Sequence, residues 1–143
     1  MSFREIICLT GIALNLLAVP AVAQDDTSFQ LELNNAADTA DGNCRLTYVA
    51  SNNSEEGLEQ VSYEVAVFDG EGTVTRILVL EFGALPVGKT KVLQFDLAGQ
   101  QCSDTSRIVV NDVADCSLSS GDTGDFCLSG LATASRTAIQ FGT

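Results

Sequence analysis

The sequence contains no histidine and no tryptophan among its 143 residues. Histidine is the usual general base near neutral pH and the commonest metal ligand, so its absence excludes the common histidine-dependent nucleophilic sites. Basic residues are also scarce, with 7 lysines and arginines against 19 acidic residues and a net charge of −12. Nucleic acid and anionic lipid surfaces repel such a protein, so we expect neither as a partner.

No apolar run reaches the roughly 20 consecutive residues that a membrane span needs. The run from Ile6 to Val19 follows a short start with Arg4 and precedes the small residues Ala21-Val22-Ala23. A basic start, an apolar stretch and small residues before a cleavage point are typical of a secretory signal. We therefore predict a signal peptide over residues 1–23, a periplasmic or secreted product, and no membrane insertion after cleavage.

Removal of 23 residues from 143 leaves 120, a length that fits one domain over residues 24–143. The predicted signal holds one basic and one acidic residue, Arg4 and Glu5, so the net charge of −12 is unchanged by cleavage. The acidic residues are scattered along the chain rather than gathered in a tail. We expect them to form a solvated, repulsive surface that keeps the protein monomeric.

The mature chain has no Cys-x-x-Cys spacing, although it holds four cysteines: Cys44, Cys102, Cys116 and Cys127. An even number of cysteines in an exported chain, with no histidine to complete a zinc site, predicts two structural disulfides. Four cysteines allow three pairings, and the count alone does not choose among them.

Apolar and polar residues alternate with a period of two, which predicts β-strands rather than helices. An Asp69-Gly70 step predicts a hairpin turn. The stretch Val74–Phe82 is apolar on both sides except at Arg76 and Glu81, as expected of a strand covered on both faces or passing between sheets. Residues 129–133 fit a strand or a helical turn. The other predicted strands cover residues 29–33, 44–50, 61–67, 93–97, 106–113 and 134–141.

About seven short strands separated by turns predict an all-β fold, a single immunoglobulin-like β-sandwich of antiparallel strands stabilised by disulfides. In such a sandwich the second and sixth strands start at the same pole. Cys44 opens the second strand and Cys102 precedes the sixth, which favours a Cys44–Cys102 disulfide. Cys116 and Cys127 would then pair and hold the loop after the sixth strand.

The segment Val61–Leu97 resembles the middle of small bacterial immunoglobulin-like domains of the FxLYD and CARDB kind. The resemblance rests on Tyr63-Glu-Val-Ala-Val-Phe-Asp69, the corner Leu85-Pro-Val-Gly88, and the returning Phe95-Asp-Leu97. The whole chain also resembles small periplasmic proteins of proteobacteria. These resemblances imply a fold and a location, and they carry no functional residues with them.

The string Gly83-Ala-Leu-Pro-Val-Gly88-Lys89-Thr90 matches the pattern of a nucleotide-binding P-loop. That site needs a helix directly after the loop, whose free N–H groups meet the phosphates. Residues 91–97 alternate as a strand, so we interpret the string as a corner between two strands.

Four aspartates cluster in sequence near the last two cysteines: Asp112, Asp115, Asp122 and Asp125. Because calcium binds several oxygens at once, these residues are the candidate metal ligands, although no EF-hand spacing is present. We predict a non-enzymatic exported domain, without a cofactor, that acts through a protein or cell-envelope partner. The alternative is a calcium-binding or small hydrolytic periplasmic module that uses these acidic residues.

Overall fold

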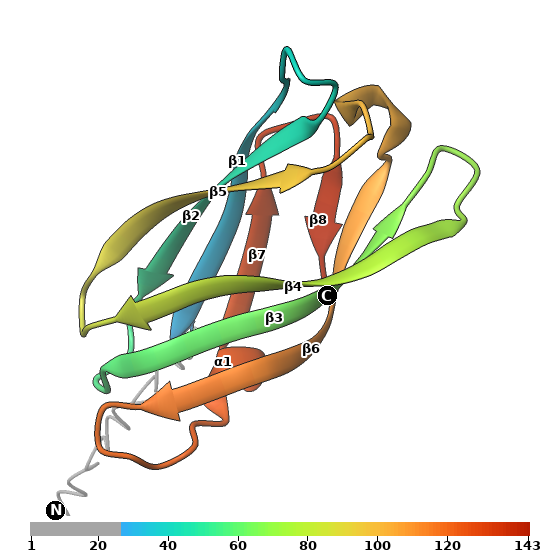
Figure 1. Cartoon of the computed structure of the whole chain (residues 1–143). Helices are drawn as coiled ribbons and strands as arrows, with labels where there is room; N and C mark the ends of the chain where they lie inside the picture. The colour runs from blue at the N-terminus through green and yellow to red at the C-terminus, as the bar shows by residue number, and fades with distance from the viewer. Residues whose placement is uncertain (1–26) are drawn as a thin grey trace, which may run out of the picture.

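The computed structural model describes residues 27–143, so the predicted signal peptide lies outside the described residues. The chain folds into two four-stranded sheets that pack face to face (Figure 1). Two short helices, η1 (Cys102–Asp104) and α1 (Phe126–Ser129), interrupt the strands. The strands are β1 (Phe29–Asp38), β2 (Cys44–Asn52), β3 (Leu58–Phe68), β4 (Val74–Leu85), β5 (Thr90–Leu97), β6 (Arg107–Leu118), β7 (Leu131–Ser135) and β8 (Gln140–Gly142).

Sheet A has the order β5-β2-β1-β7, and sheet B has the order β4-β3-β6-β8. The edge strands β4 and β5 follow each other in sequence and are joined by the corner at residues 86–89, from which they diverge (Figure 1). On this side of the sandwich, β4 is therefore the edge strand of sheet B and β5 is the edge strand of sheet A. The opposite side is held by the β7–β8 connection, which passes from sheet A to sheet B.

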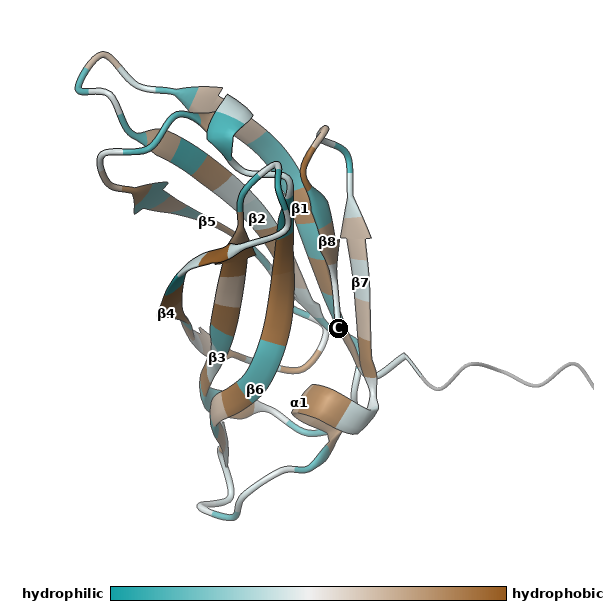
Figure 2. Ribbon diagram, turned by 90° about the vertical axis from the view of Figure 1, so that its right-hand side faces the viewer, coloured by the Kyte–Doolittle hydropathy of each residue, from teal (hydrophilic) through white to brown (hydrophobic). Residues whose placement is uncertain are grey.

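The core lies between the sheets and is built from the inward residues of the alternating strands. On β2 the buried positions are every second residue from Cys44 to Asn52, which is the period that the sequence predicts. β3, β4 and β6 also contain many hydrophobic residues (Figure 2). The centre is an aromatic cluster in which the Phe82 ring centroid lies 5.9 Å from Tyr48, 6.1 Å from Tyr63 and 5.4 Å from Phe95.

The structure confirms the predicted all-β sandwich, with differences near the end of the chain. Eight strands are present where about seven were expected. Two pairs are parallel, β1 with β7 and β6 with β8, although all strands were expected to be antiparallel. The predicted last strand over residues 134–141 is wrong, because the chain breaks at residues 136–139 to cross between the sheets. Residues 129–133 were expected to form a strand or a helical turn. The strand agrees better with the structure, because β7 begins at Leu131.

The expectation that Val74–Phe82 is covered on both faces or passes between sheets is also wrong. β4 is an edge strand that pairs with β3 on one side, and its outward side chains face solvent. Ile77 is 59% exposed, Val79 is 48% exposed and Val74 is 45% exposed. Burial within the domain therefore explains the apolar residues on the inner face of this strand but not those on its outer face.

The two tyrosines of the core differ in how their hydroxyl groups are satisfied. Tyr63 Oη donates a hydrogen bond to the backbone oxygen of Cys127 at 2.6 Å. Tyr48 Oη is buried and has no hydrogen-bond partner among the described residues. Burial raises the pKa of both phenols, so both remain protonated donors at neutral pH.

We expect opposite effects from removing these two hydroxyls. Tyr48→Phe should raise the free energy of unfolding by about 1 kcal/mol, because a buried polar group without a partner is removed. Tyr63→Phe should lower it by about 1 kcal/mol, because the Cys127 carbonyl loses its donor. Urea unfolding followed by circular dichroism measures both changes. A loss of stability in both variants would show that the Tyr48 hydroxyl is satisfied in the folded protein.

Candidate functional site

The four mature cysteines form two disulfides, Cys44–Cys102 and Cys116–Cys127, which are the pairs that the sequence favours. Cys44 opens β2, and Cys102 opens the short helix before β6, so their Cα atoms lie 4.7 Å apart at one pole. The backbone N–H of Cys102 donates to Asp38 Oδ1 at 2.7 Å. Cys116 near the end of β6 and Cys127 on α1 hold the loop at residues 119–125.

The candidate metal ligands do not converge. Asp112 and Asp115 lie on β6, whereas Asp122 and Asp125 lie in the loop that follows. Among residues 27–143, one group of three side chains brings possible metal-ligand atoms within 4.8 Å of one another. It consists of Asp38, Cys44 and Cys102. Those two sulfurs are joined in a disulfide, so the group is not a metal centre. No three of the four aspartates bring carboxylate oxygens within 4.8 Å of one another, so the described residues do not favour the calcium alternative.

The P-loop string lies on a strand, a turn and a strand. Gly83 belongs to β4, Lys89 N–H donates to the Pro86 carbonyl across the turn at 3.0 Å, and Thr90 begins β5. Gly88 has a φ of +69°, a conformation that favours glycine and closes the corner. No helix follows within this stretch, so the backbone does not form a phosphate-binding loop there.

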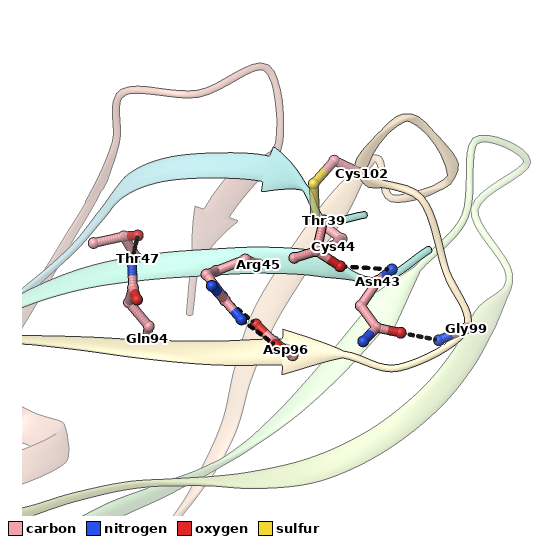
Figure 3. A network of polar contacts seen from close by, with 9 residues as sticks. All are labelled: Thr39, Asn43, Cys44, Arg45, Thr47, Gln94, Asp96, Gly99 and Cys102. Carbon is pink, nitrogen blue, oxygen red and sulfur yellow. Dashed lines mark hydrogen bonds and ion pairs between the residues drawn. A yellow bond between two sulfur atoms is a disulfide. The ribbon is translucent and has the colours of Figure 1, made fainter. Parts of the chain in front are cut away.

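The outer face of sheet A is occupied by side chains that bind one another. Arg45 pairs with Asp96 through two hydrogen bonds of 2.8 Å (Figure 3). Gln94 Nε2 donates to Thr47 Oγ1 at 3.2 Å on the same pair of strands (Figure 3). Hydrogen bonding to Arg45 lowers the pKa of the Asp96 carboxyl. These polar groups satisfy one another and leave little for a ligand to bind.

A second ion pair lies on β1, where Arg136 Nε contacts Glu32 Oε1 at 2.8 Å. Hydrogen bonding to Arg136 lowers the pKa of the Glu32 carboxyl. Both pairs are solvent-exposed, so each adds little to stability. Arg45 and Arg136 are therefore both already paired with acids.

The outer face of sheet B is different because it carries an apolar area. Cross-strand partners point to the same face, so Ala66 on β3 lies beside Ile77 on β4 and Val109 on β6. In the same way Phe68 lies beside Val74, and the Arg107 guanidinium lies 4.2 Å from the Phe68 ring centroid. We call this area the outer patch: Ala66, Phe68, Val74, Ile77, Val79 and Val109.

Acidic side chains border the outer patch. Glu64 on β3 is the cross-strand partner of both Val79 on β4 and Asp112 on β6. Farther along the same face, Ser62 lies between Glu81 and Asp115. Neither of the two ion pairs within residues 27–143 involves these four acids. This face of the sandwich therefore joins an apolar surface to a group of unpaired negative charges.

The side of the sandwich between β4 and β5 is incompletely closed. Leu78 on β4 and Leu93 and Phe95 on β5 point inward and pack against the core, but they are only partly buried. We call these three residues the open seam. Lys91 Nζ bridges one end by donating to the Phe82 carbonyl at 2.8 Å, and Arg76 Nη2 bridges the other by donating to the Ala98 carbonyl at 3.1 Å.

Sequence reasoning missed both the outer patch and the open seam. The available signal was the stretch Val74–Phe82, apolar on both sides except at Arg76 and Glu81, which was interpreted as a strand covered on both faces or passing between sheets. In a sandwich of antiparallel strands such a run also fits an edge strand whose outer face is left for a partner. The hairpin turn that precedes the run, with Asp69 Oδ1 accepting from the Glu71 and Thr73 backbone, does not indicate which strand is the edge.

These features define an all-β, disulfide-stabilised sandwich with one apolar edge strand. No family model matches the sequence, and no curated protein matches it. The resemblance to FxLYD and CARDB domains therefore stays an expectation. The solved structure of IrmA from Escherichia coli is similar in fold, with a TM-score of 0.56 at 12% sequence identity, covering 73% of this chain and 89% of the IrmA chain. At this identity the similarity shows the fold alone.

Proposed function

We propose that this protein is an exported, non-enzymatic domain that binds a protein partner through the outer patch of sheet B. The observation that carries the proposal is the exposure of Val74, Ile77 and Val79 side by side on one edge strand. Contiguous apolar surface bordered by charge is characteristic of protein interaction sites. The outer face of sheet A offers the contrasting case, because its polar side chains are paired with one another.

The disulfides support the proposed location of the protein. Two disulfides suggest an oxidising compartment outside the cytoplasm. None of the helices among residues 27–143 has the length and apolar character that a membrane span requires. With the predicted signal peptide, the disulfides support a periplasmic or secreted protein, and we propose that it meets its partner there as a monomer.

Site-specific photo-crosslinking in living cells tests which face the partner contacts. A photoreactive amino acid at Ile77 should give a discrete higher-mass adduct, because this side chain lies in the outer patch. The same amino acid at Thr47, on the outer face of sheet A, is the matched control and should give none. Adducts from Thr47 but not from Ile77, or from neither position, would contradict the proposal.

A further inference from the structure

We infer that the partner is an extended segment with alternating apolar and basic side chains, which adds to sheet B as a fifth strand beside β4. The inference rests on the proposed function and specifies how the partner binds. It names residues 77–81 of β4 as the place of addition. The argument has three parts: the free backbone edge, the open seam and the acidic border.

The free backbone edge lies on the side of β4 away from β3. β4 is last in the strand order of sheet B, so on this side its N–H and C=O groups have no neighbouring strand. Lys91 Nζ lies over the second half of the edge, where it contacts the Phe82 carbonyl at 2.8 Å and the Ala84 carbonyl at 3.5 Å. A lysine at an edge opposes strand pairing. Arg76 Nη2 bridges the gap near the start of the strand, where it donates to the Ala98 carbonyl at 3.1 Å. The available length is therefore the stretch between these two bridges, residues 77–81.

The open seam supplies an apolar surface for one face of an added strand. A strand beside β4 lies over the space between β4 and β5, and every second side chain of that strand points toward the core. Those side chains would cover Leu78, Leu93 and Phe95, which are partly buried now. Apolar residues at alternating positions gain most from this contact.

The acidic border favours basic residues on the outward face of the added strand. Its outward side chains would lie next to Ile77 and Val79, with Glu81 on the same strand and Glu64 one strand farther. Lysine or arginine fits both the apolar residues and the glutamates, because the aliphatic stem covers apolar surface while the charged end reaches a carboxylate. A second copy of this chain fits poorly, since each copy carries a net charge of −12 and presents the same glutamates.

The β5 edge is a weaker place for such a strand. Its outward acid, Asp96, is already paired with Arg45 at 2.8 Å. Val92 is exposed at 63%, but it is the sole large exposed apolar residue on that strand. A basic segment therefore finds, at the β4 edge and not at the β5 edge, both apolar area and carboxylates that form no ion pair within residues 27–143, Glu81 on β4 and Glu64 on β3.

Peptide binding to the purified, disulfide-bonded protein tests the inference. The probe is a labelled peptide of about eight residues in which valine and lysine alternate, long enough for one strand. Fluorescence anisotropy should show saturable binding, whereas a peptide with glutamate in place of lysine should bind at least about tenfold more weakly because it meets the same acidic border. Equal binding of the two peptides would overturn the charge preference.

A pair of double variants locates the contact. Ile77→Lys/Val79→Lys places lysines beside the added strand and should weaken binding of the lysine peptide roughly tenfold or more. Thr47→Lys/Val49→Lys makes the same charge change on the outer face of sheet A and should leave binding within about twofold. Equal losses in both would mean that binding follows net charge rather than this edge, and would overturn the inference.

Backbone methylation of the peptide separates strand addition from contact through side chains alone. Alternate N–H groups of an added strand face β4, and the others face solvent. N-methylation at one set of alternating positions should abolish binding, while methylation at the other set should be tolerated. If both methylated peptides bind equally well, the partner does not add as a strand.

The outcomes also distinguish this inference from the proposed function. If no peptide binds while Ile77 still gives adducts in cells, the partner contacts the outer patch in another way, so the inference fails and the proposed function stands. If Ile77 gives no adduct, the proposed function itself fails. A protein that sediments as a dimer, and as a monomer after Ile77→Lys/Val79→Lys, would show that a second copy occupies the edge and would overturn the inference.

Discussion

Replacing both Cys44 and Cys102 by alanine is expected to lower the free energy of unfolding by about 4 kcal/mol. The disulfide joins residues 58 positions apart, so its loss releases a long loop in the unfolded chain. It also anchors the start of β2 to the segment before β6, and so ties sheet A to sheet B. Urea unfolding of the oxidised protein and of the variant measures the difference.

The second disulfide provides the matched control. Cys116 and Cys127 lie 11 positions apart, so the Cys116→Ala/Cys127→Ala variant should lose about 3 kcal/mol, less than the first variant. Both variants remove two buried or partly buried sulfur atoms, which makes the packing losses comparable. If the short-loop variant is the less stable of the two, loop length does not control the contribution of these disulfides.

Much of the fold could be predicted because each strand with one buried face shows its period directly in the sequence. Phe29, Leu31 and Leu33 are all fully buried on β1, as their alternation with polar residues indicates. The same reasoning located β2, β3 and β5. It also placed Cys44 and Cys102 at a common pole, because the start of a strand and the approach to another are visible as breaks in the pattern.

The path at the end of the chain could not be predicted for a physical reason. β7 and β8 contain five and three residues, too few for a period of two to stand out. Their parallel pairing with β1 and β6 depends on contacts with strands about a hundred and about thirty residues earlier in the chain. Local sequence carries no record of such distant neighbours.

The candidate site was missed because an exposed apolar residue has the same local pattern as a buried one. Ile77 and Val79 alternate with Leu78 and Leu80 in a run that the sequence alone assigns to a covered strand. Only the strand order, with β4 at an edge, shows that one face is bare. The four aspartates present the opposite case, since their closeness in sequence does not bring three of their carboxylates within 4.8 Å of one another.

Phe82→Ala is expected to lower the free energy of unfolding by about 4 kcal/mol. Phe82 is fully buried, and its ring lies between Tyr48 and Tyr63 from opposite sheets and against Phe95. Removing the ring leaves a cavity that the rigid strands around it cannot fill, because backbone pairing holds them in place. Chemical unfolding followed by tyrosine fluorescence gives the difference, and near-ultraviolet circular dichroism checks that the aromatic cluster has loosened.

Phe95→Ala is the matched comparison, because it removes the same ring from the open seam. Phe95 is only partly buried, so less apolar surface returns to water and solvent can enter the space that is left. We expect about half the loss found for Phe82→Ala. A loss as large as that of Phe82→Ala would mean that the seam is as tightly packed as the centre of the core. In that case an added strand would have no apolar surface to cover there, and the inferred mode of partner binding would lose one of its three supports.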